Sequence, residues 1–321
     1  MSTLINYDLI LKLKSIEENL FRFGGPILIF LGIISNIFSF IVFIQKNLRK
    51  NPCSIYFMVF NISNIIIIFG GLLPPVLELG FNIDYSLYNL NLCRLRLYIA
   101  ISFNCICPFI LILASIDRVL ITSSNVHIRK VSSIKNAFIL IIIGILFWLL
   151  SSSPIMIFST ILQIGLNSFI CYPETNIYIT IISYGSFIKE ILVPLLMIFF
   201  GLWAIKNVHR MKHITITPLS LQTRTGLPSI QAKDRQLILM LIINIIIYVP
   251  FSLFLSIFLI YQQFTQYNSK SIEDIQILQF IFRLATYCTY VPYCLTSYAH
   301  LLMSKTFRNE LINLILHRRL F

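Results

Sequence analysis

The amino-acid sequence predicts an all-α membrane protein, a seven-transmembrane helix bundle with a short amphipathic eighth helix. Charged residues make up 12% of the 321 residues, about half of the roughly 25% typical of soluble domains. Hydrophobic residues make up 57%, and the mean hydropathy is +0.85. Apolar stretches of about 20 residues, enough to span a bilayer as a helix, recur along the whole chain. We therefore expect a chain that crosses a membrane repeatedly, and not two soluble domains.

The first three apolar runs predict membrane helices at about residues 25–44, 53–77 and 92–121. Each of them reaches the length that a membrane-spanning helix needs. Residues 1–24 precede the first run and are expected to form an extracellular N-terminal segment.

Four further runs predict helices at about residues 135–162, 178–208, 234–261 and 275–303. Lys189 and Glu190 interrupt the second of these runs. A charge near mid-bilayer costs on the order of 2.5–3.5 kcal/mol on insertion scales, so such residues point to a function. The seven helices make up one transmembrane domain, residues 25–303.

Residues 304–321 are expected to form the amphipathic eighth helix and a short cytoplasmic tail. Phe307, Leu311, Leu314 and Ile315 recur at helical spacing, and the other faces carry polar and basic residues. Such a helix lies in the plane of a membrane surface and is attracted to anionic lipids.

The basic residues predict the orientation of the bundle. With the N-terminus outside, the inner connections and tail hold 17 basic and three acidic residues, and the remainder holds eight basic and nine acidic ones. Cytoplasmic loops carry an excess of lysine and arginine. We therefore expect a multi-pass plasma-membrane protein with an outside N-terminus and a cytoplasmic C-terminus. Its net charge of +13 then suits the anionic lipid bilayer, and no nucleic-acid partner is expected.

Two of the seven cysteines, Cys93 and Cys171, lie at the outer face in this topology. Disulfides form in the oxidising environment outside the cell, so these two are expected to be joined. Such a bond would hold the second outer loop over the bundle. The closely spaced Cys105 and Cys107 are not expected to bind metal, because they point in different directions and no histidine accompanies them.

Asp117, Arg118 and Val119 end the third predicted helix, and Arg118 lies 25 residues after Cys93. This spacing resembles the rhodopsin-like G-protein-coupled receptors, whose Asp-Arg-Tyr motif closes helix 3 at the cytoplasmic face. The resemblance covers about residues 25–316, and further landmarks fall in the family's order: Asn36 in helix 1, Trp148 in helix 4, Pro194 in helix 5 and Pro250 in helix 6. The stretch NLRKNPCSIYF, residues 47–57, resembles invertebrate FMRFamide-type neuropeptide receptors.

The resemblance implies a role for Arg118, whose guanidinium is always charged. It would pair with Asp117 in a closed bundle and bind the C-terminal helix of a heterotrimeric G protein when the cytoplasmic end opens. Arrestin would be a further partner. The alternative is an interfacial ion pair that only ends the helix, worth about 0–1 kcal/mol.

Several positions depart from the family's pattern. Asn64 replaces the helix-2 aspartate that binds sodium, and Tyr248 replaces a tryptophan two residues before the helix-6 proline. The Asn-Pro-x-x-Tyr motif of helix 7 is absent; His300 takes the place of its tyrosine, with Tyr298 as a rival. Asp234 is the candidate for the acid at the base of helix 6. Sodium binding and the route of activation therefore stay open.

Ala100 occupies the position at which amine receptors carry an aspartate, and helix 7 has no lysine to hold retinal. Amines and light are therefore not expected as stimuli. The expected ligand pocket combines mixed charges with aromatic rings, which suits a peptide: Glu78, Tyr98, Lys189, Glu190, Arg283 and Tyr287. Adjacent helical residues diverge by about 100°, so either Lys189 or Glu190 would face the ligand and the other a neighbouring helix. An ion pair, or extension of these groups to the headgroups, is the alternative.

The sequence thus predicts a receptor that binds an extracellular ligand, a neuropeptide, and activates a heterotrimeric G protein. It predicts no enzymatic activity, cofactor or metal, because no nucleophile–base pair, phosphate-binding glycine loop or metal cluster is evident. One alternative is a chemosensory receptor for small molecules. The other is a transporter or channel, which predicts internal repeats and broken helices around a midplane site; neither is visible.

Overall fold

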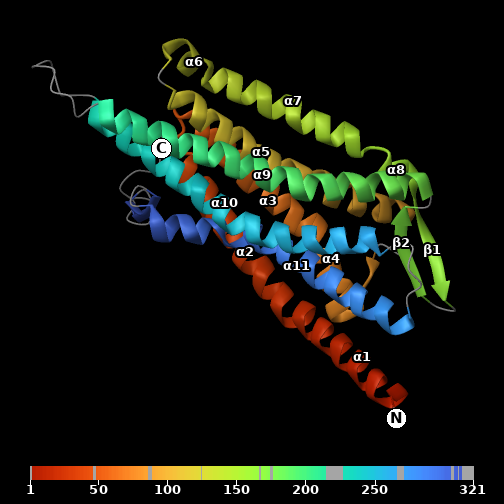
Figure 1. The fold of residues 1–321 in the computed structure, drawn as a ribbon. Coiled ribbons are helices and arrows are strands. Elements are labelled where there is room, and N and C mark those ends of the chain that lie inside the picture. The colour runs from red at the N-terminus through yellow and green to blue at the C-terminus, as the bar shows by residue number, and fades with distance from the viewer. Residues whose placement is uncertain are drawn as a thin grey trace, which may run out of the picture.

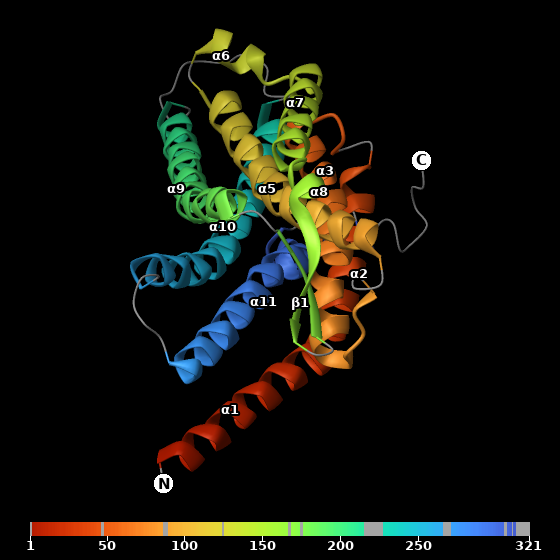
Figure 2. The same cartoon turned by 90° about the vertical axis from the view of Figure 1, so that its right-hand side faces the viewer.

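The computed structural model is a bundle of long helices with a two-stranded β-hairpin at one end (Figure 1). It describes residues 2–45, 48–85, 89–123, 125–165, 168–173, 176–214, 227–265, 271–304, 307–309 and 311–312. The short helix α6 (Val126–Val131) lies at the opposite end of the bundle from the strands β1 (Ser159–Gly165) and β2 (Ser168–Pro173) (Figures 1 and 2). We call these two ends the α6 end and the hairpin end.

The N-terminal residues form one helical segment with the first membrane helix. It consists of α1 (Ser2–Asn19), the π-helical turn η1 (Leu20–Gly24) and α2 (Gly25–Phe43). The expected boundary at residue 25 is therefore not a break in the backbone. Phe21 explains the continuity: it is buried and packs edge-on against Tyr287, with ring centroids 5.2 Å apart. Beyond this contact, α1 projects past the bundle at the hairpin end (Figure 2).

The second helical segment begins at α3 (Pro52–Ile67) and continues with η2 (Ile68–Leu72), α4 (Leu73–Pro75) and η3 (Val76–Gly80). Asn51 caps its start, since the side chain accepts a hydrogen bond from the Cys53 N–H. The π-helical turns surround Pro74 and Pro75, which have no N–H to continue the regular ladder. The segment runs three residues beyond the expected end at 77.

The central helix is α5 (Leu90–Ile121), which packs against α3, α7 (Ile134–Ser152) and α9 (Asn176–Ile214). Its contact with α7 is close, because a Cβ added at Gly144 would lie 2.0 Å from Cε1 of Phe109. Small residues that let membrane helices approach are typical of such interfaces.

The helix expected to reach residue 162 ends ten residues earlier, at Ser152. A turn at Ser153 and Pro154 leads to the short α8 (Ile155–Phe158), and β1 begins directly after it. β1 pairs antiparallel with β2, with Ile161 opposite Cys171. The prediction of a helix over residues 159–162 is wrong, because the isoleucines and threonine of this apolar run also favour a strand. The fold is therefore not purely α-helical.

Three long helices complete the bundle: α9, α10 (Leu227–Phe264) and α11 (Ile272–Met303). Pro194, Pro250 and Pro292 lie inside them; prolines are tolerated in membrane helices because neighbouring groups satisfy the freed carbonyls. A capping box between Ser271 and Asp274 starts α11.

Six helical segments in the described part of the chain are long and apolar enough to cross a membrane: Asp8–Phe43, Pro52–Gly80, Leu90–Ile121, Ile134–Phe158, Tyr184–Asn207 and Gln236–Phe264. The outer face of α7 exposes large apolar side chains, among them Ile143, Phe147 and Leu150, which suits contact with lipid. These observations indicate a multi-pass membrane protein. The seventh expected span lies within α11, which is 32 residues long but is not among the six; its tyrosine, threonine, serine and histidine side chains make it less apolar.

The expected eighth helix is described only in part. Residues 307–309 and 311–312 are helical, and Phe307 is buried against Phe43. Leu314 and Ile315 lie outside the described residues.

Candidate functional site

A buried ion pair ends α5 at the α6 end. Nη2 of Arg118 lies 2.6 Å from Oδ2 of Asp117, and the two side chains are 0% and 4% exposed. Nη2 also donates to Oδ1 of Asn51, at 2.8 Å. Because both charges are removed from solvent, the pair differs from an exposed interfacial ion pair, whose contribution to stability is about 0–1 kcal/mol.

The connection between α6 and α7 holds the other oxygen of Asp117. Oγ of Ser132 donates to Oδ1 of Asp117, at 2.5 Å. We call Asn51, Asp117, Arg118 and Ser132 the Arg118 cluster. Its four residues come from the start of α3, the end of α5 and the α6–α7 connection. The hydrogen bonds of the cluster therefore join these three parts of the chain.

A second contact at the same end joins α5 to α9. Thr122 donates to the Arg118 carbonyl at 2.6 Å, and Nδ2 of Asn207 donates to the Val119 carbonyl and to Oγ1 of Thr122, both at 3.4 Å. Val119 itself is buried in the core. The side chain of Asp234, the expected acid at the base of helix 6, lies outside the described side chains.

His300 on α11 faces α10 within a group of aromatic rings. Its Nε2 lies 2.9 Å from Oδ1 of Asn244, and the side chain is buried. Three phenylalanine rings pack edge-on around the imidazole: Phe43, Phe57 and Phe307. The rival residue, Tyr298, donates to the Leu31 carbonyl of α2 at 3.1 Å, so the hydrogen bonds of the two side chains go to different helices.

The helix-1 and helix-2 landmarks lie together. Nδ2 of Asn36 donates to the carbonyls of Gly32 and Tyr293, both at 2.8 Å, and Oδ1 of Asn36 accepts from Nδ2 of Asn64 at 3.0 Å. Both asparagines are 1% exposed. This group joins α2, α3 and α11 through neutral amides.

Lys189 and Glu190 form an ion pair with each other and are nearly buried. Oγ of Ser252 donates to Oε2 of Glu190 at 2.6 Å, and Oγ of Ser256 donates to its backbone carbonyl at 2.8 Å. Of the alternatives expected for these two residues, the structure shows the ion pair. The pair joins α9 to α10. Tyr248 lies one turn below Ser252, with its ring 6.3 Å from that of Tyr293.

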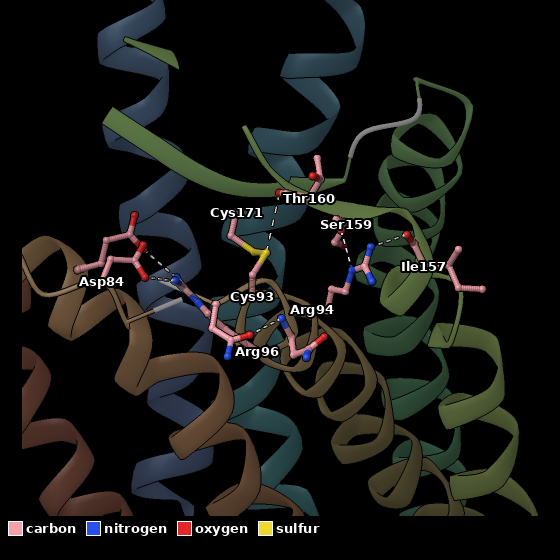
Figure 3. Close-up of a disulfide and its surroundings, with 11 residues drawn as sticks. Asp84, Cys93, Arg94, Arg96, Ile157, Ser159, Thr160 and Cys171 are labelled. Carbon is pink, nitrogen blue, oxygen red and sulfur yellow. Dashed lines mark hydrogen bonds and ion pairs between the residues drawn. A yellow bond between two sulfur atoms is a disulfide. The ribbon is translucent and has the colours of Figure 1, made fainter. Parts of the chain in front are cut away.

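The disulfide expected between Cys93 and Cys171 is present at the hairpin end, with a Cα–Cα distance of 5.7 Å (Figure 3). Beside it, Nε and Nη2 of Arg94 donate to the carbonyls of Ser159 and Ile157, at 3.0 and 3.3 Å. The start of β1 is thus fixed to α5 by an arginine, and β2 by a covalent bond.

Arg96 pairs with two carboxylates: it lies 2.8 Å from Glu78, and it lies 3.5 Å from Asp84 (Figure 3). The pKa of the neighbouring Tyr85 phenol is raised, because burial raises it more than the positive charge of Arg96 lowers it. The expected pocket residue Glu78 is therefore engaged with the protein itself.

The remaining expected pocket residues also have protein partners. Tyr98 donates to the Leu149 carbonyl at 3.1 Å, Arg283 lies 2.6 Å from Glu17 of α1, and Tyr287 packs against Phe21. These three side chains contact α7, α1 and η1, respectively. Trp148 packs edge-on against Phe109 and Phe147. Within the described residues, no three of histidine, cysteine, aspartate and glutamate gather so as to hold a metal ion.

Sequence reasoning missed several residues of these sites, among them Asn51, Ser132, Asn207 and Asn244. Asn51 stands directly before Pro52 at a helix start, where an asparagine cap is favoured, but nothing in the sequence connects that cap to Arg118.

No family model matches the chain, and no similar protein was found among curated proteins.

Proposed function

We propose that the chain is a seven-helix receptor of the rhodopsin-like kind, in which an extracellular ligand changes the Arg118 cluster and thereby activates a heterotrimeric G protein. In this proposal α11 is the seventh span, the hairpin end faces outside and the α6 end faces the cytoplasm of a plasma-membrane protein. The observation that carries the proposal is the buried pair of Asp117 and Arg118, held from three elements at the end of the central helix.

The geometry supports a two-state site. An arginine that is 0% exposed cannot bind a partner protein. If the contacts of the Arg118 cluster break, the planar guanidinium can bind carbonyl or carboxylate oxygens of an inserted helix instead. Asn51 and Ser132 favour the closed state, since both bond only when α3 and the α6–α7 connection lie against α5. Phe307 and its neighbours would form the eighth helix at the same end.

The hairpin end supports the ligand side of the proposal. The disulfide and Arg94 hold the hairpin at the end of α5. Three charged pairs lie toward the same end of the bundle: Glu78–Arg96, Asp84–Arg96 and Glu17–Arg283. Charged groups partly shielded from water suit an extended polar ligand, and we propose a peptide. A small-molecule chemosensory ligand is the alternative within the same fold. A transporter or channel belongs to a different class, and none of the contacts described above favours it.

The test is nucleotide exchange on purified G-protein heterotrimers, with the receptor in lipid nanodiscs and a library of amidated peptides as ligands. Wild type, Arg118→Ala and the control Arg129→Ala, an exposed arginine of α6, are compared at equal amounts of folded protein. We expect a peptide to raise exchange with wild type and Arg129→Ala and not with Arg118→Ala. Equal exchange with Arg118→Ala would refute the role of Arg118. Solute uptake into vesicles without a G protein would support a transporter.

A further inference from the structure

Two adjacent serines between α6 and α7 make different contacts. Oγ of Ser132 donates to Asp117 at 2.5 Å, whereas Oγ of Ser133 accepts from the Asn136 N–H at 3.3 Å and caps α7. Ser132 therefore belongs to the Arg118 cluster, whereas Ser133 stabilises only the start of α7.

The chain around Ser132 has the shape and charge of a kinase substrate. Ser132 and Ser133 are both extended, with ψ of 91° and 154°. They follow a helix of only six residues, α6, and helices so short are marginal on their own. Arg129 and Lys130, three and two residues before Ser132, are exposed. Kinases that recognise basic residues N-terminal to the target bind such extended segments in an acidic cleft.

We propose that Ser132 is a phosphorylation site for a basophilic serine/threonine kinase, and that its phosphorylation separates the α6–α7 connection from Asp117. Oγ of Ser132 would attack the γ-phosphorus of ATP, forming a new O–P bond. The bond from that phosphorus to the β–γ bridging oxygen breaks, ADP leaves, and the serine proton passes to the kinase's catalytic base. The inference rests on the proposed function, which places the α6 end in the cytoplasm.

The effect follows from the contacts already described. Phosphorylation removes the hydroxyl proton that Ser132 donates and adds a charge of about −1.5 to −2. The nearest charged group is the Asp117 carboxylate, which pairs through its other oxygen with Arg118. Like charges at this distance repel, so the α6–α7 connection leaves Asp117 and the closed state of the Arg118 cluster loses one of its supports.

The first test is covalent. Full-length protein in nanodiscs is incubated with ATP and the catalytic subunit of cAMP-dependent protein kinase, and the sites are mapped by mass spectrometry. We expect one phosphoryl group on Ser132, retained in Ser133→Ala. In Arg129→Gln/Lys130→Gln the rate should fall about tenfold, which corresponds to roughly 1.4 kcal/mol of lost ion pairing. Modification of Ser133 alone, or of an isolated 126–136 peptide but not of the folded protein, would overturn the proposal.

The second test is structural. Hydrogen exchange of the amides of residues 126–134 should rise in phosphorylated protein and in Ser132→Asp, and rise less in Ser132→Ala, which loses one hydrogen bond without gaining charge. Ser133→Asp, which adds the same charge at the start of α7, should leave it near the wild-type value, because negative charge suits a helix N-terminus. Unchanged or slower exchange in Ser132→Asp would overturn the proposal.

Neither test uses a G protein, so the two proposals fail separately. If peptides drive nucleotide exchange while Ser132 stays unmodified, only the kinase site is wrong. If Ser132 is modified but no exchange occurs, the receptor proposal is wrong. Ser132 could be phosphorylated in the purified protein but not in cells that contain the active kinase. That result would overturn the cytoplasmic placement of the α6 end, on which this inference rests.

Discussion

Nδ2 of Asn64 donates a 3.0 Å hydrogen bond to Oδ1 of Asn36, and both side chains are buried where α2, α3 and α11 meet. Two amides can satisfy each other without an ion or a proton, because each has both donors and acceptors. The contact therefore joins three helices by neutral groups.

Asn64→Leu keeps the branching of the side chain and removes the donor. In membrane proteins such interhelical bonds contribute about 0.6 kcal/mol on average and up to about 1.7 kcal/mol, so we expect a loss of stability in this range. Chemical unfolding in mixed micelles measures it. Asn91→Leu, at an exposed asparagine of α5, is the control, and equal losses in both variants would contradict the prediction.

Asn64→Asp places a carboxylate against the Asn36 oxygen, and two acceptors repel unless a cation lies between them. We expect the thermal stability of wild type to be the same in sodium and potassium. The variant should be less stable than wild type and gain sodium dependence. A sodium effect on wild type that persists in Asn64→Leu would show that this amide pair is not the site.

Asp117→Asn keeps the shape of the side chain but removes the charge of Asp117 from its buried ion pair with Arg118. Breaking a buried ion pair at one partner costs about 3–5 kcal/mol, so we expect a large fall in the free energy of unfolding and higher ligand-free nucleotide exchange. Asp8→Asn is the control, since Asp8 pairs with Lys12 in an exposed position where a pair is worth about 0–1 kcal/mol. If Asp117→Asn is as stable as wild type, Asp117 and Arg118 do not form a buried ion pair in the membrane.

Reduction of the Cys93–Cys171 bond should destabilise the hairpin end. The two cysteines are 78 residues apart in the sequence, and disulfides typically contribute about 2–4 kcal/mol. Cys93→Ser and Cys171→Ser should lower the melting temperature equally, and a reducing agent should then have no further effect. Cys288→Ser, at a free cysteine, should melt as wild type does. Additive losses in the double serine variant would mean that the two cysteines are not bonded to each other.

The apolar runs predicted most of the helices because a helix satisfies its own backbone in lipid, which makes hydropathy a strong signal. The same signal failed at the ends of the spans. Residues 159–165 are as apolar as a helix end but form β1. The first helix begins well before residue 25, with α1 and with η1, where Phe21 packs beside Tyr287. The periodicity of apolar residues indicates which face of a helix is buried, but it does not indicate which distant residues pack against that face.

The candidate sites show the same division. The pairing of Arg118 with its sequence neighbour Asp117 was expected from the motif. The partners Asn51 and Ser132 are 67 and 15 residues away from the residues they contact, and polar residues at helix ends are too common to indicate a pair. For Lys189 and Glu190, helical geometry argued that the side chains diverge, but the flexible lysine stem and the cost of a lone buried charge favour the pair.

This pair gives the sharpest test of the bundle interior. Lys189→Met and Glu190→Gln each leave one charge buried without its partner, and each should cost about 3–5 kcal/mol. The double variant leaves no charge, and the amide oxygen introduced by Glu190→Gln can still accept from Ser252. We therefore expect it to be more stable than either single variant, because replacing both charges of a buried pair is often neutral or stabilising. Chemical unfolding of the four proteins gives the coupling energy. If the two single losses simply add in the double variant, the side chains act independently, and one of them is then available to a ligand as the sequence first suggested.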